Sequence, residues 1–240
     1  NINYSTKNID LYKDDSTNEL FGALGYLAEI DLEKNSNEKK HLLTPKMLVR
    51  YSPGSMRKET DGPRLGTQNA FYLNRLDDKI NNYETGLTAT LGFDYKLKGD
   101  LSTFDFSIAQ IINDKENKKM SSESSLDEKL SDLVGESQYK LNDKISLNYN
   151  FAIDQNYSDL NYNLIGSTMN FDNLNINFDY LQEKKHYGNK EYFNTKIDYN
   201  LNESTNLSFK TKRNLITNSS EFYNLSYEYI NDCLRAGIVY

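Results

Sequence analysis

The sequence has 240 residues, of which 28 are Lys or Arg and 35 are Asp or Glu, and its formal net charge is −7. This acidic balance offers no basic surface for phosphate backbones, so we expect no nucleic acid as a partner. Apolar residues make up 37% of the chain and nowhere approach a run of about 20, which excludes a helical membrane protein. The 19 Tyr and 11 Phe favour strands, and a membrane β-barrel is compatible with this composition.

The first half of the chain combines strand patterns with two long polar connections. The residues HLLTP around His41 are typical of a strand end, and a polar connection runs from about 52 to 84. The alternating runs GLTATLGFDYKL and LSTFDFSIAQII flank the short turn KGD. A second polar connection covers 113–132. Its segment SSLDEKLSDL offers a serine cap for a short helix, and its composition is otherwise that of a solvated loop.

The second half alternates apolar and polar residues with a period of two. In KISLNYNFAI, Leu147 and Tyr149 share one face, and Asn148 and Asn150 share the other. The same period returns in 174–180 and 193–201, followed by the strand-like runs NLSFKTKRNLI and FYNLSYEYI, with turns such as LNDK, FDN and LNES. We count about a dozen strands, or thirteen with generous boundaries. Because most are joined by tight turns, the sequence predicts an all-β fold, an antiparallel up-and-down meander.

The sequence contains no pattern typical of a catalytic or metal centre. Its two histidines, His41 and His186, are not part of a spaced set of ligands, and no phosphate-binding loop or nucleophile elbow is present. Asp77 and Asp78 are adjacent and would point to opposite faces of a strand, so they do not form a pair of catalytic carboxylates. We therefore expect no enzyme, no cofactor and no metal site.

Four stretches resemble one family. The closing segment YEYINDCLRAGIVY resembles the last part of the lipopolysaccharide-assembly outer-membrane proteins, the LptD family. HLLTPKMLVRYSPG, then FYLNRLDD with YETG, then SDLVGESQYKLNDKISLNYNFAID are similar to further stretches of that family in the same order, and Asn74 and Arg75 match directly. The similarity runs from about His41 to Tyr240. It is interrupted at Asp77-Asp78-Lys79, where the family tends to have a small residue and Asp-Arg.

The resemblance implies both an architecture and a function. Residues 1–240 would be a fragment of a large C-terminal outer-membrane β-barrel of a Gram-negative bacterium, without the family's N-terminal periplasmic domain and final strands. Such a barrel delivers lipopolysaccharide to the outer leaflet. The implied partners are lipopolysaccharide, a plug lipoprotein, a periplasmic bridge protein and outer-membrane lipids. Cys233 matches a family cysteine near the end of the barrel, so the resemblance implies a disulfide to a cysteine outside this chain.

A barrel with this role would place its apolar side chains in lipid and its polar side chains around the lumen. On this interpretation we expect the following residues to face the lumen: Asn148, Asn150, Asn175, Asn177, Asp179, Asn194, Lys196 and Asp198. Two alternatives remain open at this point. The same strands would suit a porin-like outer-membrane channel, or a secreted β-sheet module for adhesion or binding.

Overall fold

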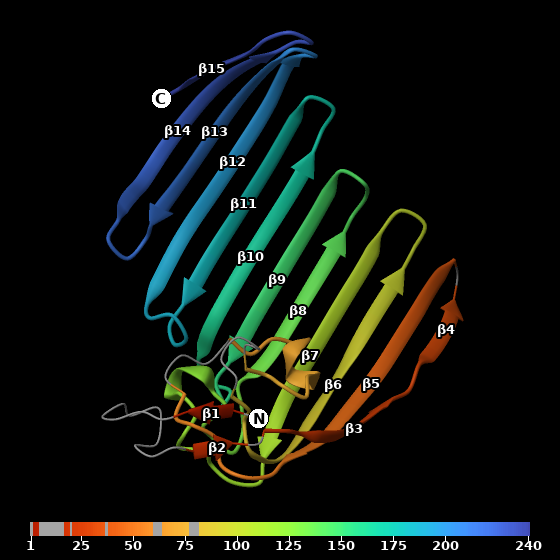
Figure 1. The fold of residues 1–240 in the computed structure, drawn as a ribbon. Helices are drawn as coiled ribbons and strands as arrows, with labels where there is room; N and C mark the ends of the chain where they lie inside the picture. The colour runs from red at the N-terminus through yellow and green to blue at the C-terminus, as the bar shows by residue number, and fades with distance from the viewer. Residues whose placement is uncertain (1, 5–16, 20, 37, 60–63, 77–81) are drawn as a thin grey trace.

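The computed structural model describes residues 2–4, 17–19, 21–36, 38–59, 64–76 and 82–240. In these residues thirteen strands form one antiparallel sheet, and β1 (Ile2–Tyr4) pairs separately with β2 (Thr17–Glu19). The predicted all-β, up-and-down architecture is confirmed, because each strand from β5 to β15 pairs with the next along the chain (Figure 1). The strands of the large sheet are β3 (Leu24–Glu29), β4 (Leu32–Ser36), β5 (Lys39–Ser52), β6 (Gly86–Lys98), β7 (Thr103–Asn113), β8 (Leu133–Lys140), β9 (Ile145–Ile153), β10 (Leu160–Asn170), β11 (Leu174–Glu183), β12 (Lys190–Asn202), β13 (Thr205–Asn214), β14 (Ser219–Ile230) and β15 (Arg235–Val239).

The edge next to β5 consists of two short strands, because both β3 and β4 pair with β5. The interruption between them lies opposite Pro45, whose carbonyl accepts a hydrogen bond from the backbone N–H of Ile30 at 3.3 Å. In an antiparallel strand the N–H and C=O of one residue point to the same side. The N–H that proline lacks therefore falls where the neighbouring strand is interrupted, so β5 accommodates a proline without losing a regular ladder bond.

The two rims of the sheet have unequal connections. The turns at 99–102, 141–144, 171–173, 203–204 and 231–234 lie together at the upper rim in Figure 1, and they include the predicted turns KGD, LNDK, FDN and LNES. Asparagine side chains close some of them. The Asn142 side-chain oxygen, for example, accepts hydrogen bonds from the N–H groups of Lys144 and Ile145, each at 2.9 Å. The long connections, 53–85 and 114–132, lie at the opposite rim.

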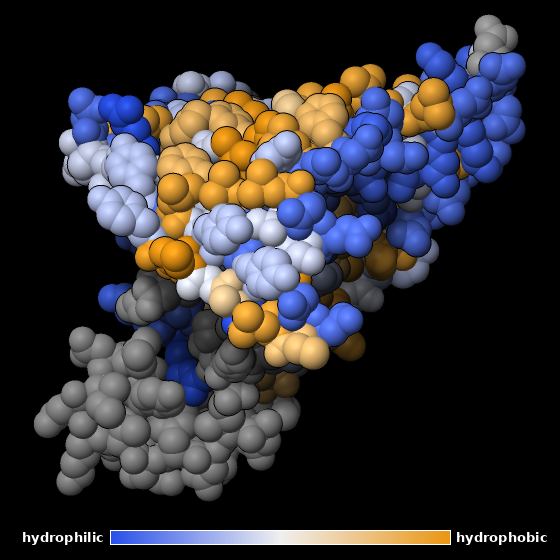
Figure 2. All heavy atoms as spheres, turned by 90° about the horizontal axis from the view of Figure 1, so that it is seen from above, coloured by the Kyte–Doolittle hydropathy of each residue, from blue (hydrophilic) through white to orange (hydrophobic). Residues whose placement is uncertain are grey.

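Cross-strand register separates the side chains into two faces, since residues directly opposite each other in a sheet point to the same side. One row of the apolar face crosses Tyr149, Ile165, Tyr180 and Phe193. The adjacent row, on the polar face, crosses Asn148, Gly166, Asp179 and Asn194. The apolar face is not covered by other parts of the described chain: Leu147 is 45% exposed and Ile165 is 44% exposed. Hydrophobic residues accordingly form surface patches in the view from above (Figure 2).

The hydrophobic core lies on the polar face, at the rim with the long connections. Leu65 and Ala70 of the first connection and Met120 and Leu126 of the second pack against strand residues of β7 to β10 such as Ile111. The expectation of a solvated loop over 113–132 is therefore wrong for the residues packed in this core, whereas 114–116 and 118–119 are exposed. The short helix expected in SSLDEKLSDL (124–133) is also absent, and a 3-10 turn, η3 (Ser122–Ser124), ends at the first residue of this segment. A similar turn, η1 (Asn69–Phe71), lies in the first connection. No helix in the described ranges is long and apolar enough to cross a membrane.

Candidate functional site

Arg75 anchors the first connection to the sheet. Its guanidinium is completely buried, and Nη1 donates to the Glu84 carboxylate at 2.9 Å. Nη2 donates to the hydroxyls of Thr88 at 3.1 Å and Thr90 at 3.0 Å, both on β6, and Nε donates to the Ala70 carbonyl at 3.2 Å. A buried charge is stable only when its donors are satisfied. These bonds therefore fix the connection against the inner surface of the sheet.

A second arginine, Arg50 on β5, strengthens the same attachment. Its Nε donates to the Leu73 carbonyl at 2.6 Å, and its Nη2 donates to the Glu84 carbonyl at 2.7 Å. Arg50 and Arg75 thus hold both ends of the segment that contains the Leu-Asn-Arg motif. Asp77 and Asp78, by contrast, lie outside the described residues.

A longer-range ion pair connects the first connection to β11. Arg64 bonds to the carboxylate of Glu183, which is 1% exposed, and its guanidinium lies 3.8 Å from the ring centre of Tyr162 on β10. The other carboxylate oxygen of Glu183 accepts the backbone N–H of His186 at 3.2 Å. The connection after β5 is therefore attached to β10 and β11, which are separated from β5 in the sheet by β6 to β9.

Asp132 and His186 form a buried pair beside that ion pair. Nε2 of His186 lies 3.8 Å from the Asp132 carboxylate, which also accepts a hydrogen bond from Asn161 at 2.9 Å and lies 4.0 Å from the Lys185 ammonium. Burial lowers the pKa of His186 to about 4, an effect that the nearby Glu183 carboxylate opposes. Burial likewise raises the pKa of Asp132 above its ordinary value. His186 is therefore neutral at pH 7.

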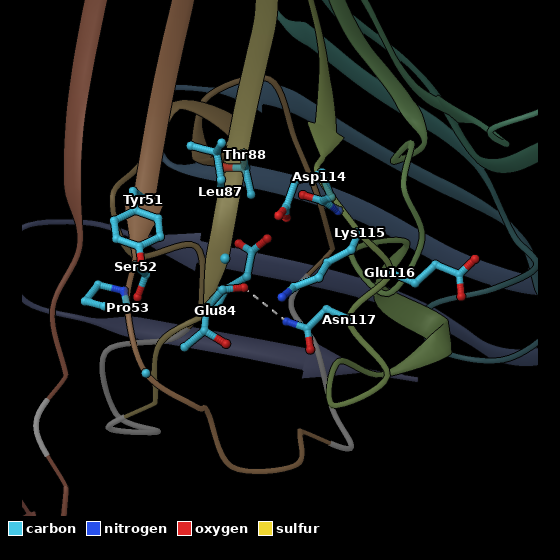
Figure 3. Close-up of a pocket in the computed structure, with 14 residues that line it drawn as sticks. Tyr51, Ser52, Pro53, Glu84, Leu87, Thr88, Asp114, Lys115, Glu116 and Asn117 are labelled. Carbon is cyan, nitrogen blue, oxygen red and sulfur yellow. Dashed lines mark hydrogen bonds between the residues drawn. The ribbon is translucent and has the colours of Figure 1, made fainter.

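The two long connections also contact each other. The Glu59 N–H donates to the Lys119 carbonyl at 2.7 Å, and the Lys119 ammonium donates to the Met56 carbonyl at 2.8 Å. Near this contact, a pocket of about 180 Å³ separates the ends of β5 and β6 from the second connection (Figure 3). Lys115 extends toward Glu84 in that view, whereas Glu116 points away from it. The pocket is small and polar, so it serves as a junction between the connections rather than as a passage for a large ligand.

All eight side chains predicted to face a lumen lie on the polar face. Asn148, Asp179 and Asn194 belong to one cross-strand row, as described above. Asn177 lies opposite Lys196, and Asn175 lies opposite Asp198. Asn150 is two residues from Asn148 on β9 and shares its face. The register therefore places the set together, whereas its lumen-facing role stays a prediction.

Gly166 shows how closely this face is packed. A Cβ atom at this position would overlap the side chains of Asn148 and Asp179, which lie on either side of it. Toward β7 the face is open, with a hollow of about 290 Å³ lined by Asn148 and Asn150 together with Asp105 and Glu136. The strands thus present amides and carboxylates to a space that the long connections do not fill.

The remaining sequence candidates lie apart from one another. His41 lies near the start of β5, and its Nδ1 is 2.9 Å from the hydroxyl of Tyr95 on β6. In the part of the chain that the structure describes, no three or more His, Cys, Asp or Glu side chains are grouped to hold a metal ion. Cys233 is a free, exposed thiol in the turn between β14 and β15. Its N–H donates to the Asn231 side chain at 3.0 Å, so the thiol lies at the rim with the short turns.

Sequence reasoning did not find the anchoring network of the long connections. Arg75 is distinguished in the sequence by its match to a motif, but Arg50, Arg64 and Glu183 carry no local signal that distinguishes them from surface charges. Their partners are 23 to 119 residues away along the chain. Only the fold brings them together.

The fold and site define a class of protein: an antiparallel sheet with one polar and one apolar face, partly covered on its polar face by inward-folded connections, as in the wall of a membrane β-barrel. A sequence model of the LptD family, described as LPS transport system D, matches residues 3–212, and the chain belongs to that family. No curated protein matches the chain.

Membership in this family gives the coarse function. The LptD family transports lipopolysaccharide to the outer membrane, works with other proteins of the same transport system, and is a transport family rather than a family of enzymes. The resemblance seen in the sequence is thereby confirmed. Lipopolysaccharide transport is favoured over the porin-like and adhesion alternatives. The match ends at residue 212, so the disulfide of Cys233 stays a prediction.

Proposed function

We propose that this chain forms part of the wall of an outer-membrane barrel translocon that delivers lipopolysaccharide to the outer leaflet. The observation that carries the proposal is the separation of polar and apolar side chains onto opposite faces of one continuous sheet. An amphiphile needs a polar route for its sugars while its acyl chains remain in hydrocarbon. The polar face provides the route, and the exposed apolar face contacts membrane lipid.

The unequal rims give the wall an orientation. In outer-membrane barrels the short turns are periplasmic and the long connections are extracellular. The anchored connections at 53–85 and 114–132 would then form an outer cap over this part of the lumen. The open polar face below them leaves room for the plug lipoprotein. The periplasmic bridge protein would deliver the lipid at the rim with the short turns.

Charge substitutions on the two faces test this arrangement. Leu147→Arg and Ile176→Arg place a charge on the apolar face, and we expect them to prevent assembly of the full-length protein in the outer membrane. Asn148→Arg and Asn177→Arg introduce the same charge one residue away, on the polar face, and we expect assembly close to that of the wild type. The amount of folded protein is measured by its heat-dependent mobility in gels of outer-membrane fractions. The opposite pattern would show that the faces are reversed.

The position of Cys233 supports the predicted disulfide, because a thiol at the periplasmic rim is in an oxidising compartment. We expect the full-length protein to migrate differently with and without reductant, and we expect Cys233→Ser to remove that difference. Ser226→Cys is the control: it adds a thiol on β14 while Cys233 is kept, so it should leave the difference in mobility unchanged. An unchanged shift in Cys233→Ser would exclude Cys233 as a disulfide partner.

A further inference from the structure

Three lysines gather on the polar face of β12 and β13. Lys196 and Lys210 are directly opposite each other, and Lys212 is opposite Asn194 in the next position of the same face. Lys210 is exposed and the side chain of Lys196 is 44% exposed, whereas the Lys212 ammonium lies 3.9 Å from the ring centre of Tyr192. In a chain with a net charge of −7, this group is a local concentration of positive charge.

The chain neutralises this charge only in part. Lys196 contacts Asp198 at 2.5 Å, and Lys212 contacts Glu221 at 2.7 Å. Lys210 makes no ion pair among the described residues, and Asp198 reaches it only through a longer-range Coulomb attraction. Two like charges directly opposite each other destabilise a sheet. An anionic ligand on the polar face above Lys196 and Lys210 would reduce that repulsion.

A polar pocket continues this column of side chains toward the rim with the short turns. It has a volume of about 490 Å³ and is lined mainly by amides and hydroxyls, together with two carboxylates: Asn200, Asn202, Ser204, Asn206, Glu203 and Glu228. Amide and hydroxyl groups both donate and accept hydrogen bonds, so this lining can pair with the hydroxyls of a sugar.

We propose that β12 and β13 form a contact site for the phosphorylated sugar of the transported lipid. Lys196, Lys210 and Lys212 bind the phosphate groups, and the pocket around Asn206 binds sugar hydroxyls. This inference rests on the proposed function and adds the substrate group that this part of the wall contacts. The column begins at the rim assigned to the periplasm, so the sugar meets the hydroxyl-binding pocket before the lysines.

The chemistry of the site suits transport. Lysine binds phosphate as a point charge without fixed geometry, and exposed ammonium groups remain hydrated. Such contacts attract an anion but release it again, which a transport pathway requires. The contact should also weaken as the ionic strength rises, because salt screens exposed charges.

The test uses the full-length protein in living cells with a photo-crosslinking amino acid in place of Asn224, which lies opposite Lys210 on β14. We expect a covalent adduct with lipopolysaccharide. In the Lys196→Gln/Lys210→Gln variant we expect the adduct yield to fall about thirtyfold, because each of the two lysines contributes about 1 kcal/mol near an anionic lipid. Lys196→Arg/Lys210→Arg should keep most of the yield, since it keeps the charge.

Lys96→Gln is the matched control, because Lys96 also lies on the polar face and pairs with one carboxylate, Asp105, at 2.8 Å. It should leave the yield at Asn224 unchanged. A second crosslinker at Asn148 reports on the lumen as a whole. If Asn148 gives an adduct and the yield at Asn224 does not respond to the glutamine variant, the phosphate site is wrong while the proposed function stands. If neither position gives an adduct, the proposed function is overturned as well.

Discussion

Glu84→Ala is expected to lower the free energy of unfolding by about 3–5 kcal/mol, the cost of leaving one partner of a buried ion pair without the other. The Arg75 side chain is 0% exposed and would keep its charge in a dry environment without the carboxylate. Because Arg75 also holds Thr88 and Thr90, the attachment of the first connection to β6 should loosen. The urea midpoint of the purified full-length protein, followed by the loss of its folded gel mobility, measures the change.

The same variant should open the cap of the proposed lumen. We expect cells that carry Glu84→Ala to become more sensitive to large antibiotics that the intact outer membrane excludes. Lys144→Ala, which removes an exposed ion pair with Asp172 in a turn, is the control and should alter neither property. Arg75→Ala/Glu84→Ala should recover part of the lost stability, since no buried charge is left unpaired. Equal effects of Glu84→Ala and Lys144→Ala would refute the anchoring role.

The stability of the loop-covered region should fall between pH 6.5 and pH 4 because of His186. Its pKa is about 4 in the folded protein against an ordinary 6.5, so acid protonates the unfolded chain first. The contribution of His186 is fully present above pH 6.5, decreases as the pH falls, and is lost by about pH 4. A difference of about 2.5 pKa units corresponds to about 3 kcal/mol.

The other groups around His186 determine how this effect must be measured. Asp132 has a raised pKa, so it takes up its proton first in the folded state and stabilises that state as the pH falls. Glu183, Arg64 and Lys185 also contribute to the field at the imidazole. The His186→Gln variant keeps these groups, so we compare its urea midpoint with that of the wild type from pH 7 to pH 4. The difference in free energy of unfolding between the two proteins should change by about 3 kcal/mol over this pH range. A constant difference would contradict the prediction.

The sheet was predictable from the sequence because its determinants are local. The alternation at Leu147, Asn148 and Tyr149 determines which side chains share a face, and turns such as LNDK determine which strands are neighbours. Both signals lie within about ten residues. The up-and-down order and the common face of the eight polar residues followed from these signals alone, whereas the exact number of strands and their register did not.

The folding of the long connections was not predictable, because polar composition normally indicates exposure to solvent. Ser124, Ser131 and Asp132 are all buried, yet each is polar and lies in a segment that reads as solvated. Partners for such residues come from distant strands, as when the Ile111 N–H of β7, beyond the stretch that pairs with β8, donates to the Ser131 hydroxyl at 2.9 Å. These partners are in place only after the strands have assembled.

Nearest-neighbour pairing of the strands also determines an order of folding. The hairpins from β6 to β15 close short loops, except for β7 and β8, which the long connection 114–132 joins, so the sheet grows mostly by local steps with a small loss of chain entropy at each step. The Arg64–Glu183 ion pair instead joins residues 119 positions apart and requires β10 and β11 to be in place. The connection after β5 must therefore wait, unattached at this contact, while the next six strands assemble. The cap is then among the last parts of this region to form.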